Sequence, residues 1–274
     1  MSKPKISIII STYNSVAWLE NVLWSYETQT YQDFEIVIAD DGSKQPTFDL
    51  IEKMKTEVSF PIIHVWHEDE GFQKSRILNK AILACTTDYI LMSDGDCMAR
   101  KDFVQVHMDF REEGYFLSGG YFMLPMDISK AITKEIIFSQ ECFKVKWLKA
   151  QGLKVSFKNN KLTATGFRSK LLNTLTPTNA SWNGHNASGW KKDIIAVNGF
   201  DERMQYGGQD RELGERLFYY GIKSKQIRYS AICLHLDHPR GYKNQESIDK
   251  NLAIRATTKK EKKAWTDFGI KKNS

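Results

Sequence analysis

Four short apolar runs recur through the first hundred residues, and this repetition constrains the fold more than any other feature of the sequence. The runs are "KISIIIST" (5–12), "FEIVIAD" (34–40), "PIIHVW" (61–66) and "DYILMS" (88–93). Continuous apolar runs of this length are typical of parallel strands buried on both faces. Apolar residues at helical spacing separate the runs, for example Leu78, Ala81, Ile82 and Cys85. The sequence therefore predicts an α/β fold with a doubly wound, mostly parallel central sheet.

Composition places the chain among ordinary globular proteins. Hydrophobic residues make up 41% and charged residues 26% of 274 residues, and no apolar run approaches the ~20 residues that span a bilayer. The first residues read as a strand rather than as a secretion signal. The cysteines are scattered without a CxxC pair, which favours reduced thiols and a cytoplasmic setting. They are Cys85, Cys97, Cys142 and Cys233.

The net charge of +6 is unevenly distributed. Residues 255–274 hold seven lysines and arginines against Glu261 and Asp267, a local charge of +5. We expect residues 241–274 to form a basic C-terminal tail, either a solvated helix or a peripheral contact with an anionic membrane at its inner face. No motif that reads nucleic acid accompanies this charge, so no nucleic-acid partner is expected.

Polar residues follow three of the predicted strands at the point where each strand ends. They are Thr12 and Tyr13 after the first strand, Asp40 and Asp41 after the second, and Asp94 and Asp96 after the fourth. Ligands in parallel sheets bind beyond the carboxyl ends of the strands, so these side chains are expected to share one rim. Asp-Gly is also a common turn dipeptide. Two acids so close nevertheless repel unless a cation or water separates them, and oxygen ligands favour Mg²⁺ or Mn²⁺.

Two nucleotide-binding motifs are missing from the chain. Neither GxGxxG nor GxxxxGK[ST] occurs, which argues against a dinucleotide enzyme or a P-loop ATPase. A sugar-1-phosphate nucleotidyltransferase, the alternative enzyme class, would be expected to carry a glycine-rich loop after its first strand, where this chain has "STYNS". A non-catalytic module that binds a nucleotide sugar or a glycan is the alternative outside enzymes.

Five stretches together resemble a family 2 glycosyltransferase of the GT-A fold. They are "SIIISTYN", "VIADDGS", "GFQKSRILNKAI", "LMSDGDC" and "AVNGFDERMQYGGQDRELGERL". The resemblance covers about residues 4–240, and the last stretch also resembles the C-terminal half of galactosyltransferase-type enzymes. It implies one domain over 1–240, with a nucleotide-sugar half (1–110) and an acceptor half (111–240).

The resemblance also implies a reaction. An inverting hexosyltransferase would move a sugar from a nucleotide-sugar donor, commonly a UDP-sugar, to a hydroxyl of a glycan or lipid-linked acceptor, with Mn²⁺ or Mg²⁺. Bacterial surface polysaccharide synthesis is the setting that the family suggests.

The resemblance also implies roles for individual residues. Nucleotide contacts are implied for Thr12 and Tyr13 (base and ribose), Asp40 with its neighbour Asp41 (base), and Asp94 (ribose). Relatives often have arginine where Gln73 stands, so Lys74 or Arg76 is expected at the diphosphate, and we favour Arg76. The metal ligands are implied to be Asp94, Asp96 and His235.

Asp210 matches the catalytic base. At 3.6 residues per turn it lies in line with Leu217, whereas Glu212 lies about 200° around from it. Leu213, Leu217 and Tyr220 are expected to mark the buried face, so Asp210 should point inward and Glu212 away. The loop around Trp190 is a further candidate site, because sugars stack on aromatic rings. Acceptor contacts are expected there from Asn186, Ser188 and Trp190.

Overall fold

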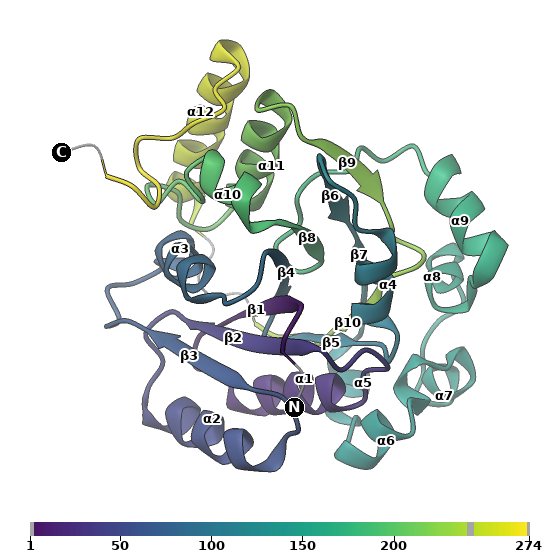
Figure 1. Cartoon of the computed structure of the whole chain (residues 1–274). Helices are drawn as coiled ribbons and strands as arrows, with labels where there is room; N and C mark the ends of the chain where they lie inside the picture. The colour runs from purple at the N-terminus through teal and green to yellow at the C-terminus, as the bar shows by residue number, and fades with distance from the viewer. Residues whose placement is uncertain (1–2, 240–243, 273–274) are drawn as a thin grey trace.

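The computed structural model describes residues 3–239 and 244–272. Its largest sheet has seven strands in the order β3-β2-β1-β4-β8-β6-β9 (Figure 1). The first four are parallel and match the four apolar runs: β1 (Ile6–Thr12), β2 (Phe34–Asp40), β3 (Ile62–Trp66) and β4 (Tyr89–Asp94). The predicted doubly wound, mostly parallel α/β sheet is confirmed.

Three helices cover the two faces of this parallel half. α1 (Val16–Glu27) and α2 (Gln45–Glu57) lie on one face, and α3 (Lys74–Ala84) lies on the other (Figure 1). Alternate residues of β1 divide accordingly, because Ile8 packs with α1 whereas Ile9 packs with α3. Burial on both faces is the physical reason why these strands read as continuous apolar runs.

The second half adds antiparallel pairing and a second sheet. β8 (Ala187–Trp190) pairs antiparallel with β4, and β6 (Tyr115–Ser118) and β9 (Lys223–Gln226) extend the sheet. A smaller sheet has the order β5-β10-β7, formed by β5 (Cys97–Ala99), β10 (Ile232–His235) and β7 (Gly120–Met123). The run at 115–124 therefore divides at its glycines into two strands of different sheets.

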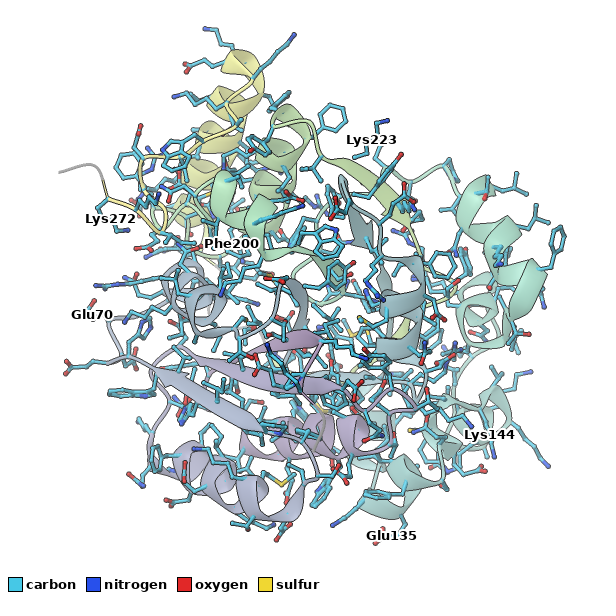
Figure 2. All side chains as sticks on the ribbon, viewed as in Figure 1. Glu70, Glu135, Lys144, Phe200, Lys223 and Lys272 are labelled. Atoms are coloured by element: carbon cyan, nitrogen blue, oxygen red, sulfur yellow. The ribbon has the colours of Figure 1, made fainter. Side chains whose placement is uncertain are left out.

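Short helices fill the region between these strands. They are α4 (Phe103–Phe110), α5 (Met126–Lys130), α6 (Lys134–Phe138), η1 (Glu141–Phe143), α7 (Val145–Ala150), η2 (Phe157–Asn159), α8 (Asn160–Thr163) and α9 (Gly166–Leu175). α10 (Lys191–Ala196) follows β8, and α11 (Gln209–Tyr219) precedes β9. Figure 2 shows Lys144 and Lys223 at the outer edge of the molecule and Phe200 inside it. No helix of the described ranges is both long and apolar enough to cross a bilayer.

The C-terminal segment is not a separate tail, which corrects the expected division at residue 240. α12 (Gln245–Glu261) packs against α11 (Figure 1), and its Arg255 pairs with Glu215. Farther along, the Asn198 side-chain amide donates to the carbonyl oxygen of Thr266 at 2.7 Å. Three of the described basic side chains pair with acids outside the segment, so its effective charge is smaller than its sequence suggests; they are Arg255, Lys259 and Lys272.

Candidate active site

The register of the sheet brings the predicted rim together. Thr12 at the end of β1 is the partner of Asp40 at the end of β2, and Ser11 is the partner of Asp94 at the end of β4. Gly95 then packs directly on β1: a Cβ atom there would lie 3.1 Å from the Ser11 carbonyl oxygen. A larger residue would push the chain away, so the glycine between the two acids keeps both at the strand ends.

Asp94 is held by protein groups. Its Oδ1 accepts hydrogen bonds from Ser11 Oγ and Lys74 Nζ, both at 2.7 Å. Burial acts to raise the pKa of Asp94, but the ammonium group of Lys74 outweighs burial and holds the pKa well below its usual range. Burial likewise acts to lower the pKa of Lys74, and the charge of Asp94 outweighs it and raises the pKa. The pair is therefore ionised near neutral pH.

Asp96 faces two histidines from the segment that ends the smaller sheet. The Nε2 atoms of His238 and His235 lie 2.8 and 3.7 Å from Asp96 Oδ2. Each ring turns Nε2 toward Asp96 because its Nδ1–H donates to a backbone carbonyl, of Leu236 for His235 and of Pro239 for His238. Metal-binding histidines are usually oriented in this way.

These donors fit a divalent cation. Ligand atoms of Asp96, Cys97 and His235 all lie within 4.8 Å of one another, and His238 adds a further nitrogen beside Asp96. The predicted ligands Asp96 and His235 are thus brought together, while the Oδ1 atom of Asp94 is occupied by Lys74. His238, which was not among the expected ligands, joins the group.

The two acids after β2 are more enclosed than expected. Asp40 is 1% exposed, with Oδ1 accepting from the Ser43 amide and Oδ2 lying 3.0 Å from His64 Nε2. Asp41 is bound by His67 at 2.8 Å and by the Gln73 amide at 3.0 Å. Burial raises the pKa of Asp41, although His67 opposes this. The histidines His64 and His67, which come from β3 and the loop after it, were missed because pairing across strands leaves no local signal.

Three other predicted nucleotide residues differ in their surroundings. Thr12 is buried, and its Oγ1 has no hydrogen-bond partner within the described residues. Tyr13 is 50% exposed and donates to Asp69 Oδ2 at 2.9 Å. Arg76 pairs at the surface with Glu70, so its expected contact with the diphosphate stays a prediction. Lys74, two residues earlier on α3, is the cation that reaches Asp94.

Asp210 directly follows a glycine-containing loop, which a residue of α12 holds in place by hydrogen bonds. Gly207 and Gly208 have φ values of +110° and +85°, a region that side chains disfavour. Asn251 of α12 is fully buried and donates to the carbonyl oxygen of Gly207 at 2.9 Å. Asp210 accepts from the Gly184 amide at 3.3 Å and from the Arg211 amide at 2.8 Å. α12 thus supports the predicted base.

His185 lies among the site's acids and was missed by the sequence reading. Its Nε2 is buried without a hydrogen-bond partner in the described part of the chain, and its ring meets the ring of Tyr121 edge-on, at a centroid distance of 4.8 Å. Burial lowers the pKa of His185, opposed by the charges of Asp94 and Asp210. His185 directly follows Gly184, whose amide donates to Asp210, so its ring lies next to the predicted base.

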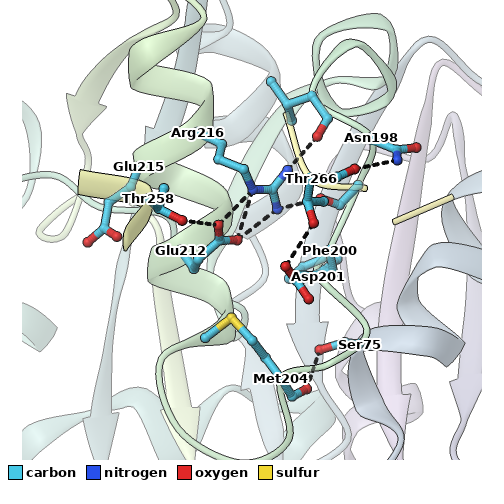
Figure 3. Close-up of polar contacts among 12 residues, drawn as sticks. Ser75, Asn198, Phe200, Asp201, Met204, Glu212, Glu215, Arg216, Thr258 and Thr266 are labelled. Atoms are coloured by element: carbon cyan, nitrogen blue, oxygen red, sulfur yellow. Dashed lines mark hydrogen bonds and ion pairs between the residues drawn. The ribbon is translucent and has the colours of Figure 1, made fainter. Parts of the chain in front are cut away.

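Glu212 is buried instead of facing solvent. It is 1% exposed and forms an ion pair with Arg216, itself 0% exposed (Figure 3). Thr258 of α12 donates to Glu212 Oε1 at 2.9 Å, and Arg216 donates to the carbonyl oxygens of Val197 and Gly199. The helical angle correctly predicted a different direction from Asp210, but α12 and the 197–199 loop cover that side. Tyr220, expected to be buried, is 50% exposed.

The three expected acceptor residues do not form an acceptor surface. Asn186 and Ser188 are 0% exposed, and both contact His107, through Nε2 at 2.9 Å and Nδ1 at 2.7 Å. Trp190 is the partner of Tyr89 at the start of β4, which is the edge opposite the rim. The prediction failed because the stretch became a central strand, and its polar groups bond inside the protein.

Comparison with known sequences agrees with the family that the motifs indicate. A model of glycosyl transferase family 2 matches residues 7–161. The chain is 27% identical to the uncharacterized glycosyltransferase YfnE of Bacillus subtilis, over 91% of this chain and 69% of that protein. It is 25% identical to chondroitin synthase of Escherichia coli, over 93% of this chain but 38% of that protein. The resemblance of the second half to galactosyltransferase-type enzymes lies mostly beyond the matched range and stays a prediction.

Solved structures share the fold. S. aureus TarS 1-349 in complex with UDP-GlcNAc has a TM-score of 0.61 at 16% identity, covering 92% of this chain and 66% of that one. The mannosyltransferase PcManGT from Pyrobaculum calidifontis, in complex with GDP-Man and Mn²⁺, has a TM-score of 0.57 at 15% identity, covering 88% and 59%. These are GT-A-type glycosyltransferases, so the expected GT-A fold is confirmed. Because the family model spans more than half of the chain, this protein belongs to glycosyltransferase family 2.

Proposed function

We propose that this glycosyltransferase transfers a hexose, with inversion and with the help of a divalent cation, from a nucleotide sugar to a hydroxyl group. The observation that carries the proposal is the Asp96–His235–His238 group beside the Asp94–Lys74 pair, with Asp210 bound by the amide that precedes His185. A UDP-sugar is the proposed donor. TarS, which shares the fold, was solved with UDP-GlcNAc.

Each part of the rim has a role in this proposal. Asp96, His235 and His238 would hold Mn²⁺ or Mg²⁺, which supplies positive charge opposite the diphosphate leaving group. Thr12 and Tyr13 remain the proposed contacts of base and ribose, with Asp40 and Asp41 behind them. The Thr12 hydroxyl, which has no hydrogen-bond partner among the residues that the structure describes, supports this assignment. Asp94 orients Lys74 toward the diphosphate and remains a proposed contact of ribose and cation.

Asp210 is the proposed general base. It takes the proton of the acceptor hydroxyl as that oxygen attacks the anomeric carbon from the face opposite the diphosphate. One displacement of this kind inverts the anomeric configuration and needs no covalent enzyme intermediate. It lies in the first turn of α11, where its carboxylate accepts hydrogen bonds from the Arg211 and Gly184 amides.

The acceptor is proposed to be a glycan or a lipid-linked glycan used in bacterial surface polysaccharide synthesis, by analogy within the family. The relative chondroitin synthase names one polysaccharide product of such an enzyme. A cytoplasmic setting is part of the proposal and is supported by the four cysteines, which are all free and buried.

A donor screen tests the proposal. The protein is incubated with UDP- and GDP-sugars and MnCl₂, and both the melting temperature and the release of nucleoside diphosphate are followed. We expect one donor to stabilise the protein and to release diphosphate slowly to water. The Asp210→Asn variant should keep the stabilisation and lose the release. Stabilisation with equal, unchanged release in both proteins would contradict the catalytic role, and no stabilisation by any donor would contradict donor binding.

A further inference from the structure

Helix α9 turns its polar side toward the protein, the reverse of an ordinary surface helix. Ser169 and Asn173 are its buried residues. The Asn173 side-chain amide donates to Ser230 Oγ at 2.8 Å, and its Oδ1 accepts from the Tyr229 amide at 2.8 Å. These bonds fix the orientation of the helix, so the direction of its opposite side is also fixed.

The opposite side of α9 is apolar and faces solvent. Phe167, Leu171 and Leu175 follow one another at four-residue spacing, and 80%, 43% and 66% of their surfaces are exposed. Residues this far apart lie along one stripe of a helix. A continuous apolar stripe in water differs from the scattered exposed apolar residues of ordinary surfaces and marks an interaction site.

The segment before α9 also exposes apolar side chains. Val155 and Phe157 are 77% and 74% exposed, and Arg168 of α9 donates to Asn160 Oδ1 at 2.8 Å, which ties the start of α8 to α9. We call these five apolar residues, together with the exposed Lys154, Lys158 and Lys170, the α9 surface. Figure 1 shows α8 and α9 at the outer right edge, away from α12 at the upper left.

The charge around the α9 surface has one sign. Between Lys154 and Lys170 the sequence contains five lysines and arginines and no aspartate or glutamate. The basic C-terminal segment is different, because Glu215 neutralises part of its charge by pairing with Arg255 and Lys259. The positive charge beside α9 is therefore less compensated by acids than that of the C-terminal segment, although the C-terminal run is more conspicuous in the sequence.

We propose that the α9 surface docks the enzyme on an anionic phospholipid bilayer. Phenylalanine and leucine side chains enter the headgroup boundary, and lysines contact the lipid phosphates, a combination typical of helices that lie on membranes. A protein partner fits less well, because lysine is depleted in protein–protein interfaces. This assigns membrane contact to α9 in place of the C-terminal segment.

The docked orientation places the active site near the membrane. Lys161 of α8 donates to the carbonyl oxygen of Tyr121 at 2.8 Å, and the Tyr121 ring contacts the rings of His185 and His235. The α8–α9 region is thus linked through Tyr121 to the part of the site that holds His185 and His235. If the proposed transferase function holds, an acceptor carried on a lipid could reach the site without leaving the bilayer.

Vesicle sedimentation of the full chain tests this docking without requiring catalysis. Vesicles of phosphatidylcholine, with or without phosphatidylglycerol, are mixed with wild type, Phe167→Gln/Leu171→Gln or Lys154→Gln/Lys158→Gln/Lys170→Gln. We expect wild type to bind the anionic vesicles and both variants to lose about tenfold or more in affinity, since each lysine near such a surface contributes about fivefold. These exposed substitutions should leave the melting temperature unchanged.

A matched control distinguishes the two basic regions. The variant Lys260→Gln/Lys262→Gln/Lys271→Gln removes as many charges from the C-terminal segment and should bind within about twofold of wild type. The proposal is overturned if wild type ignores anionic vesicles, or if this control loses binding while the α9 variants keep it. It is also overturned if wild type is a dimer without lipid that Phe167→Gln/Leu171→Gln dissociates with no change in vesicle binding.

Discussion

The strand-end rim and the interior of the second half both contain acids and histidines, but their partners differ. At the rim, Asp96 is 17% exposed and faces two histidines whose Nε2 atoms point toward it. In the interior, Glu212 is 1% exposed and all its partners are protein groups. His107 is likewise enclosed by Ser188 and Asn186.

This difference distinguishes residues that can bind a ligand from residues that only stabilise the fold. A polar group whose partners are all internal stabilises the fold and has no capacity left for a ligand. At the rim, the hydroxyl of Thr12 and Nε2 of His185 have no hydrogen-bond partner among the described residues. The first turn of α11 contains both kinds of acid two residues apart, Asp210 toward the rim and Glu212 toward the interior.

The largest expected effect concerns Glu212, where the comparison predicts lost stability and retained chemistry. Glu212→Gln leaves the buried charge of Arg216 without its partner, so the free energy of unfolding should fall by about 3–5 kcal/mol. Urea unfolding measures this, and kcat of the folded variant should remain close to wild type. The surface pair offers a control: Glu70→Gln should cost less than about 1 kcal/mol. A folded but inactive Glu212→Gln enzyme would break the comparison.

Asp210→Asn should show the opposite pattern, with lost activity and largely retained stability. Loss of a general base lowers kcat by about a hundredfold or more, while removal of two amide contacts at a helix start costs about 1 kcal/mol of stability. Donor affinity should stay nearly constant, which steady-state kinetics and thermal melting together check. An Asp210→Asn enzyme with near-normal kcat would reduce Asp210 to a helix cap.

Low pH should destabilise the folded protein through the interior histidine His107. Burial lowers the pKa of His107 to about 3, from an ordinary value of 6.5. An unfolded chain takes up a proton near pH 6.5 and the folded chain does so only near pH 3, so stability falls as the pH drops through this window. Between pH 7 and pH 5 the loss should be about 2 kcal/mol. His107→Gln should remove this component, and identical pH slopes in both proteins would contradict the assignment.

The smallest expected effect distinguishes two cations on α3. Lys74→Gln removes the charge beside Asp94 and should raise the donor KM about tenfold, the usual magnitude for losing a charged hydrogen bond. Arg76→Gln, its matched control, removes a surface pair and should change KM less than about twofold. Equal effects of the two substitutions on the donor KM would show that Arg76 also contributes to donor binding.

The parallel half and its rim could be predicted from the sequence because the signals there are local. Apolar runs identify β1 to β4, and parallel pairing requires their carboxyl ends to coincide, which brings Asp40 and Asp94 to one edge. His64 and His67 could not be predicted, because they meet Asp40 and Asp41 only through strand pairing and the loop that follows it.

The second half of the chain was harder to predict from the sequence, because tertiary contacts there override the local pattern. A helical angle gave the direction of Glu212, but only α12 determines that this direction is buried. Asn186 and Ser188 resemble loop residues until β8 is known to be a central strand. Conversely, the lack of acids between Cys142 and Lys192 was visible in the sequence and could have indicated the α9 surface.

The central claim is that the rim binds a divalent cation together with a nucleoside diphosphate. Isothermal titration calorimetry with UDP, with MnCl₂ or with chelator, tests it most directly on wild type and Asp96→Asn. We predict that chelator weakens UDP binding to wild type by about tenfold or more, and that Asp96→Asn binds weakly in either condition while melting at the wild-type temperature. Equal UDP affinity in all four titrations would contradict the claim.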